Sequence, residues 1–153
     1  MKIEGDFVVE SRIHNVWDFF LDIPQVGACV PGVESIEQLD EENIDVTLAV
    51  KVGPIKAVFK GNATLTDLRP PNSLTARGEG RDKNTASMVS ATFSVNLNEI
   101  EDSKTEVNYT VDLVIRGRLG QFGQGVIRAT AKAITSIFVK CIREKIAVKP
   151  ETG

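Results

Sequence analysis

Residues 44–65 read IDVTLAVKVGPIKAVFKGNATL, with apolar and polar side chains alternating on both sides of the Gly53-Pro54 pair. Alternation with a period of two is typical of a β-strand that has one covered face and one face in water. A glycine–proline pair between two such runs favours a turn. The stretch therefore predicts two antiparallel strands joined by a short connection.

The same alternation recurs elsewhere in the chain. Further strands are expected at 3–9, 74–81, 89–97 and 107–115. After the first of them, apolar residues between Ile13 and Leu21 recur at helical spacing, and Pro24 suits the first turn of a second short helix. The expected order is one strand, two short helices, a meander of about six strands and a final helix.

The final helix is expected from roughly residue 119 to 147, because apolar residues recur there with a helical period. At 1.5 Å per residue it would be about 40 Å long, enough to cross a whole sheet. It must cover the apolar sheet face, since no other segment can. We therefore predict an α+β fold, a curved antiparallel sheet of about seven strands around a long C-terminal helix. One domain would span 1–149, followed by a frayed tail at 150–153.

Short motifs spread in order over nearly the whole chain resemble those of a known family. They are MKIEG at 1–5, ACVPGVES at 28–35, KVGPIK at 51–56, FKG at 59–61, TDL at 66–68 with Pro70-Pro71, GEG at 78–80 and GRLGQFG at 117–123. Each motif alone is weak, but together they resemble the CoxG family of carbon monoxide dehydrogenase proteins. That family belongs to the START-like (SRPBCC) helix-grip superfamily.

The resemblance implies a ligand cavity between the sheet and the last helix. It also implies a small non-enzymatic accessory protein of molybdenum-containing carbon monoxide dehydrogenases and related oxidoreductases. The implied roles are membrane recruitment of the enzyme and handling of a lipophilic quinone or lipid, without a cofactor. Some members carry a C-terminal extension that anchors to membrane; this sequence ends at Gly153 without one. We therefore expect a cytoplasmic protein, at most peripheral at the inner face of the membrane.

Large apolar residues are spread over elements that such a fold brings together, while small residues occupy several inward strand positions. This pattern fits either a cavity or a core filled by the large side chains; periodicity favours the filled core and the resemblance favours the cavity. The expected lining is Trp17, Phe20, Phe59, Met88, Phe93, Tyr109, Phe122, Val126, Thr130 and Ile137. Few polar contacts are expected, from the Tyr109 and Thr130 hydroxyls. Substitution of Gly61 by leucine is expected to fill the cavity.

The sequence offers little material for catalysis. His14 is the only histidine and is expected to be exposed or to cap a helix, while Cys29 and Cys141 are expected to be buried, inert thiols. These residues make no zinc set and no evident nucleophile–base pair. Glu79 and Asp112 are expected in solvent. A polyketide cyclase-like enzyme and an interaction module with a filled core remain as alternatives to a ligand carrier.

The charge is unevenly distributed. The formal net charge is −3, but residues 116–153 carry eight basic and two acidic side chains, and the remainder of the chain is acidic. The polar face of the last helix collects Arg128, Lys132, Lys140 and Arg143, and Glu144 is expected to point away from them. This face is either ordinary solvated surface or a docking surface for anionic lipid or an acidic protein. Nucleic acid is not expected, because the pI is near 5.3 and no aromatic residues interleave with the basic ones.

Overall fold

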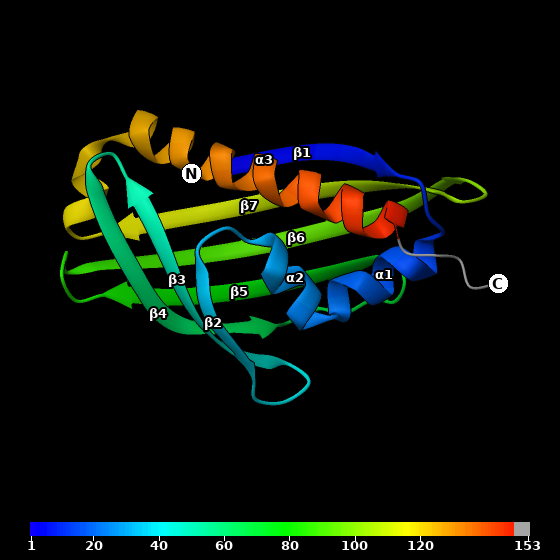
Figure 1. The fold of residues 1–153 in the computed structure, drawn as a ribbon, viewed down its shortest axis with the longest axis horizontal. Helices are drawn as coiled ribbons and strands as arrows, with labels where there is room; N and C mark the ends of the chain where they lie inside the picture. The colour runs from blue at the N-terminus through cyan, green and yellow to red at the C-terminus, as the bar shows by residue number, and fades with distance from the viewer. Residues whose placement is uncertain (149–153) are drawn as a thin grey trace.

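The structure is a computed structural model that describes residues 1–148 (Figure 1). Its elements are β1 (Lys2–Val9), α1 (Ile13–Leu21), α2 (Ile23–Cys29), β2 (Val33–Gln38), β3 (Asn43–Val52), β4 (Ile55–Leu65), β5 (Ser73–Asp82), β6 (Ser87–Glu101), β7 (Lys104–Arg116), the 3-10 helix η1 (Arg118–Phe122) and α3 (Gln124–Val148). The tail expected at 150–153 lies outside the described residues.

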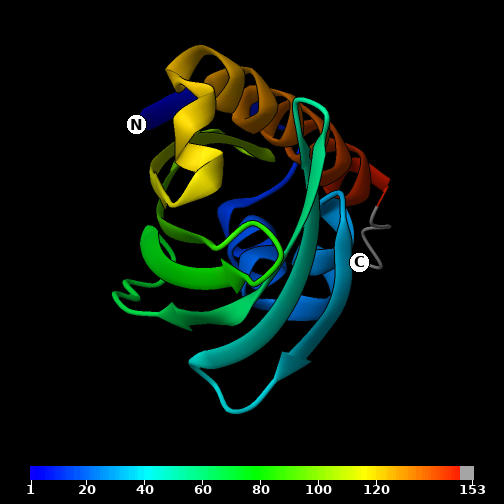
Figure 2. The same cartoon turned by 90° about the vertical axis from the view of Figure 1, so that its left-hand side faces the viewer.

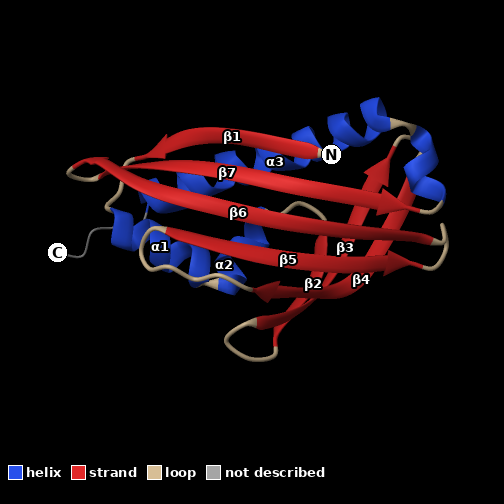
Figure 3. Ribbon diagram, turned by 180° about the vertical axis from the view of Figure 1, so that it is seen from behind, coloured by secondary structure: helices blue, strands red, loops and turns tan. Residues whose placement is uncertain are grey.

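All seven strands form one antiparallel sheet in the order β1-β7-β6-β5-β4-β3-β2. Consecutive strands from β2 to β7 are neighbours, so the central chain is a meander, and β1 adds to the far edge beside β7. The sheet curves around α3, as Figure 2 shows, and α1 and α2 lie on the same side. Seen from behind, in Figure 3, the strands lie in front of all the helices. The predicted fold class is therefore confirmed.

The last helix begins later than the sequence pattern indicates. Residues 118–122 form the separate turn η1, and α3 starts at Gln124. Gly123 stands between them with φ of 85°, in the left-handed region that cannot continue a right-handed helix. This break lets η1 place Leu119 in the core with no exposed surface, while α3 sets off in its own direction.

Buried apolar side chains form two clusters at opposite ends of the concave face. The larger joins α1 to β6, β7 and the C-terminal half of α3, and includes Trp17, Phe19 and Ile142. The smaller joins the β3–β4 hairpin to η1, and includes Phe59 and Leu119. The middle of α3 spans the space between these clusters.

The two cysteines do not remain thiols, so that expectation was wrong. Cys29, at the end of α2, forms a disulfide with Cys141 of α3, and the two Cα atoms are 5.4 Å apart. The residues are separated by 112 positions in sequence. Only the fold brings α2 against α3, so neither spacing nor composition pointed to this pairing.

Buried polar groups secure η1 to the β5–β6 turn. The carboxylate of Asp82 accepts hydrogen bonds from the hydroxyl and the amide of Thr85, at 2.7 and 3.2 Å. Thr85 also lies within hydrogen-bond distance of the Ser87 hydroxyl, which in turn accepts a bond from the amide of Leu119 at 3.0 Å. The chain between β7 and α3 is thus held to the far end of the sheet by bonds that water does not reach.

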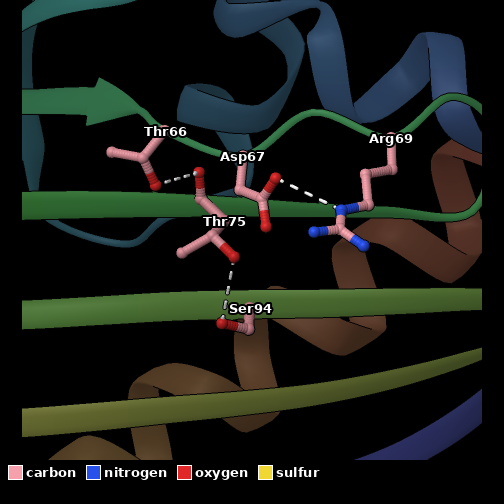
Figure 4. Close-up of polar contacts among 5 residues, drawn as sticks. All are labelled: Thr66, Asp67, Arg69, Thr75 and Ser94. Atoms are coloured by element: carbon pink, nitrogen blue, oxygen red, sulfur yellow. Dashed lines mark hydrogen bonds and ion pairs between the residues drawn. The ribbon is translucent and has the colours of Figure 1, made fainter.

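Short polar side chains occupy the sheet face that points away from the helices. The Thr75 and Ser94 hydroxyl oxygens are 3.4 Å apart across β5 and β6, and the Thr66 hydroxyl donates to the carbonyl oxygen of Thr75 (Figure 4). In the loop before β5, the Arg69 guanidinium pairs with Asp67 at 3.3 Å. These contacts are local and partly solvated, so the candidate site has to be sought on the concave face.

Candidate functional site: an apolar cavity beneath the long helix

A cavity of about 410 Å³ lies between the sheet and α3. Its wall on β7 and α3 is formed by Val107, Tyr109, Val111, Leu113, Ile115, Ile127, Thr130, Ala131, Ile134, Thr135, Phe138 and Val139. The remainder comes from Phe7, Phe20, Val26, Val30, Leu48, Val50, Val52, Phe59, Val89, Ala91 and Phe93. Members of both core clusters contribute, so the cavity occupies the space that the clusters leave open.

Two periodicities produce this wall. On β7, every second residue from Val107 to Ile115 points toward the helix, because successive side chains of a strand alternate between faces. On α3, Ile127, Thr130, Ala131 and Ile134 lie three or four positions apart, the spacing that places side chains on one helix face. The alternation of apolar and polar residues in the sequence therefore explains why the apolar side chains of β7 point toward the cavity.

The cavity is almost without polar groups. Thr130 donates its hydroxyl to the carbonyl oxygen of Val126 at 3.0 Å, and Thr135 donates to that of Ala131 at 2.8 Å. Both donors are therefore used within the helix, although the oxygens can still accept. The third polar side chain is Tyr109, and no lining residue is charged. Burial, together with the nearby charge of Asp6, raises the pKa of Tyr109, so its hydroxyl stays protonated at neutral pH.

Five of the ten residues expected at the ligand site line this cavity. They are Phe20, Phe59, Phe93, Tyr109 and Thr130. The aromatic ring of Phe93 is 6.4 Å from that of Phe20 and 6.2 Å from that of Phe138, so these three rings form one wall.

The other five expected residues lie outside the cavity. Trp17 packs in the larger core cluster, and Met88 stands near the start of β6, opposite Arg116. Phe122 packs against the smaller cluster. Val126 and Ile137 are 38% and 52% exposed. The apolar stripe of α3 is wider than the face that the sheet covers, so a helical projection places these two residues on the stripe although they point outward.

Most of the lining was not singled out from the sequence. The aliphatic residues of β3 and β7, together with Ala91, belong to the alternating runs, which carried the signal for their inward position. Ile127, Ile134 and Phe138 lie on the apolar stripe or beside it. What the runs could not show is which inward residues border empty space and which are covered by neighbours.

Gly61 does not face the cavity, contrary to expectation. It pairs with Gly80 between β4 and β5, and a side chain there would collide with the backbone of Glu79 and Gly80. Substitution of Gly61 by leucine would thus separate two strands instead of filling the cavity. Ala91 and Ala131 are the lining residues at which added side-chain atoms would enter the space.

A second, more open hollow of about 620 Å³ runs between β1 and α3. Its lining comprises Ile3, Glu4, Tyr109, Lys132, Thr135, Ser136, Val139, Lys140, Arg143 and Glu144. We call it the β1–α3 groove. Glu144 lies in it beside the basic residues, so the expectation that it points away from them was wrong.

The four basic residues expected at a docking surface differ in their surroundings. Lys132, Lys140 and Arg143 are exposed and line the groove. Arg128 instead donates a hydrogen bond from its guanidinium to the carbonyl oxygen of Lys2 at 3.3 Å, near the start of β1. Three of the four therefore form one basic wall, and the fourth helps to hold β1 to the helix.

Groups suited to acid–base or metal chemistry are scattered. His14 is exposed on α1, and Glu79 and Asp112 are exposed on the outer sheet face, as expected. Within residues 1–148, no three histidine, cysteine, aspartate or glutamate side chains gather where they could hold a metal ion. None of the helices of this part of the chain has both the length and the apolar character needed to cross a membrane.

The family model of CoxG, a component of carbon monoxide dehydrogenase, matches residues 5–147. The chain belongs to the CoxG family. No curated protein matches the sequence. This family consists of accessory subunits, and the match runs from β1 to α3, so it includes every element that contributes to the cavity lining.

Solved structures confirm the START-like helix-grip fold of this CoxG family member. A conserved protein from Geobacillus kaustophilus superposes with a TM-score of 0.87 at 24% identity, over 96% of this chain and 95% of that one. The Zhui aromatase/cyclase from Streptomyces sp. R1128 gives 0.72 at 14% identity, over 95% and 93%. A START superfamily protein from Mycobacterium smegmatis gives 0.69 at 6% identity, over 95% and 96%. At these identities the likeness shows the fold alone.

Proposed function

We propose that this protein is a non-catalytic carrier of a hydrophobic small molecule, a quinone or a lipid. The observation that carries the proposal is the apolar cavity of about 410 Å³ beneath α3. Small-molecule sites typically occupy about 300–1,000 Å³ and are lined mainly by apolar side chains. The volume is nearly three times that of the engineered cavity of about 150 Å³ that accommodates benzene, so a quinone ring or a folded acyl chain is of suitable size.

The chemistry of the lining supports binding rather than catalysis. General acid–base catalysis needs a titratable group within hydrogen-bond reach of the substrate. Tyr109 is the one titratable side chain of this lining, and its raised pKa makes it a poor base at neutral pH. A cyclase-like activity, as in the Zhui aromatase/cyclase of the same fold, is thus the less favoured proposal. An interaction module with a filled core is disfavoured by the cavity itself.

We further propose that the carrier serves a molybdenum-containing, carbon monoxide dehydrogenase-type oxidoreductase in the cytoplasm. Family membership supports this partner. The basic residues beside the groove, together with the exposed Val126 and Ile137 on α3, support reversible contact with the anionic inner face of the membrane. Each basic residue near an anionic bilayer contributes roughly 1 kcal/mol, so such contact would be weak and reversible.

The deciding experiment is native mass spectrometry of the purified protein, followed by organic extraction of whatever it carries. A co-purifying quinone or lipid, or saturable binding of a short-tailed ubiquinone added afterwards, is the expected result. A protein that carries and binds neither of them, but forms a stable complex with the enzyme, would establish the interaction module instead. Turnover of an added polyketide would support the cyclase alternative.

A further inference from the structure

We infer that the β1–α3 groove is a head-group subsite, so that the preferred ligand is a single-chain amphiphile with an anionic head. The apolar chain would occupy the cavity and a carboxylate or phosphate would lie in the groove. This inference rests on the proposed carrier function and narrows it to a chemical class. Three observations support it: the lining residues that the two hollows share, the basic side chains that form no ion pair among the described residues, and the position of Tyr109.

The cavity and the groove share a wall. Tyr109 of β7 and two residues one turn apart on α3, Thr135 and Val139, border both hollows. An acyl chain that left the cavity beside these residues would therefore enter the groove. Because no residue of the cavity lining is charged, an ionised head group would be costly to bury and must stay outside.

Three basic side chains of the groove form no ion pair within residues 1–148. Lys132 and Lys140 lie eight positions apart on α3, with Arg143 close to the latter, so the row is about 16 Å long at 1.5 Å per residue. In the described part of the chain, none of the three has a carboxylate oxygen within 4.0 Å. Glu4 and Glu144 also line the groove, leaving a formal excess of one positive charge. An anionic head group would meet donors that are free to turn toward it.

The Tyr109 hydroxyl is directed toward this boundary. The ring lies over Gly5 of β1, which is its partner in the β1–β7 ladder, and a side chain at position 5 would meet the hydroxyl. Tyr109 borders both hollows, and its hydroxyl oxygen is the atom that lies nearest to position 5 of β1, the strand at the edge of the groove. Among residues 1–148 it has no hydrogen-bond partner, so it can donate to a head-group oxygen.

The test compares two probes that differ only in the head, dodecanoate and 1-dodecanol, titrated below their aggregation limits at low salt and pH 7.5. We expect dodecanoate to bind at least tenfold more tightly than 1-dodecanol. The double variant Lys132→Gln/Lys140→Gln should lose about tenfold in affinity for dodecanoate and leave 1-dodecanol unchanged. The matched control Lys60→Gln/Lys83→Gln, which removes exposed charges away from the groove, should change neither affinity.

Equal affinity for the two probes, or an equal loss in the control variant, would overturn the head-group subsite but leave the carrier proposal standing. Failure of both probes and of the short-tailed ubiquinone to bind would overturn the carrier proposal and this inference together. Inorganic phosphate is the third probe, after dodecanoate and 1-dodecanol. If phosphate binds alone with the same dependence on Lys132 and Lys140, but does not compete with dodecanoate, the groove is a separate anion site and the inference fails.

Discussion

Tyr109 and Gly5 face each other across the β1–β7 ladder, and the tyrosine ring lies in the space that a side chain at position 5 would occupy. A glycine is needed here for close approach, not for an unusual backbone angle. The contact lets an aromatic side chain on β7 lie flat at the edge of the cavity instead of standing upright within it. The consequences can be tested at both residues.

Substitution of Gly5 by alanine should displace the Tyr109 ring into the cavity. We expect a loss of about 1–3 kcal/mol in the free energy of unfolding, the range for overpacked sites. Affinity for a cavity ligand should also fall. Urea unfolding and ligand titration measure the two effects. Because the hydroxyl lies nearest to position 5, adding Tyr109→Phe should restore part of the loss; purely additive effects in the double variant would contradict the proposed collision.

Removal of the Cys29–Cys141 disulfide should destabilise the protein. The bond closes a loop with a sequence separation of 112, and loss of a native disulfide typically costs about 2–5 kcal/mol. The variant Cys29→Ser/Cys141→Ser should therefore unfold at lower urea concentration than the oxidised protein. Dithiothreitol should lower the stability of the native sequence and leave the double variant unaffected; an equal response of both would show that the bond does not form.

The Asp82 carboxylate should make folding sensitive to acid. Hydrogen bonding by the Thr85 side chain is the main cause that lowers the Asp82 pKa below its ordinary value of 3.8. A folded-state pKa below the unfolded one stabilises the fold at pH values above about 4, and this contribution disappears as the pH falls through the folded pKa. Unfolding in urea at pH 7 and pH 3 should show a smaller difference in Asp82→Asn than in the native protein. Thr85→Val should also reduce this difference in stability between pH 7 and pH 3. A difference as large as that of the native protein in both variants would contradict this account.

The sequence predicts the buried face of a strand more reliably than the buried face of the last helix. Alternation between Ile44 and Ile115 determines the sheet, because a strand needs only its own side-chain period to show which face is buried. Cavity residues such as Phe59 and Phe93 follow from the same reasoning. Ile137 does not: its exposure depends on how α3 is rotated about its axis, and that rotation is set by packing against strands distant in sequence. The strand β2 was not located from the sequence; it lies at the edge of the sheet and has a register shift after Val33.

Charge reversal in the groove should abolish any preference for anionic membranes. In the variant Lys132→Glu/Lys140→Glu, attraction becomes repulsion, so co-sedimentation with phosphatidylserine-containing vesicles at low salt should be lost. For the native sequence, binding should weaken as salt rises, because charges at the surface are screened over about 8 Å at physiological ionic strength. The same reversal at Lys60 and Lys83 is the control. Equal sedimentation with neutral and anionic vesicles would contradict the proposed membrane contact. An acidic surface of the partner enzyme would then be the remaining candidate for the basic residues, and a pull-down would test it.

A larger side chain on α3 that fills the cavity should weaken ligand binding without destabilising the fold. Ala131 lines the cavity, whereas Ala129 is exposed on the same helix, two positions away. Alanine and leucine both favour helices, so leucine at either position should change the free energy of unfolding by less than about 1 kcal/mol. At position 131 the added carbons enter the space that a ligand would use, and affinity should fall at least tenfold, equivalent to about 1.4 kcal/mol. At position 129 affinity should not change. Fluorescence titration with a short-tailed ubiquinone, beside urea unfolding of each variant, makes both comparisons. Undiminished binding by a folded Ala131→Leu protein would show that the ligand lies elsewhere, because the leucine side chain and the ligand cannot occupy the same space.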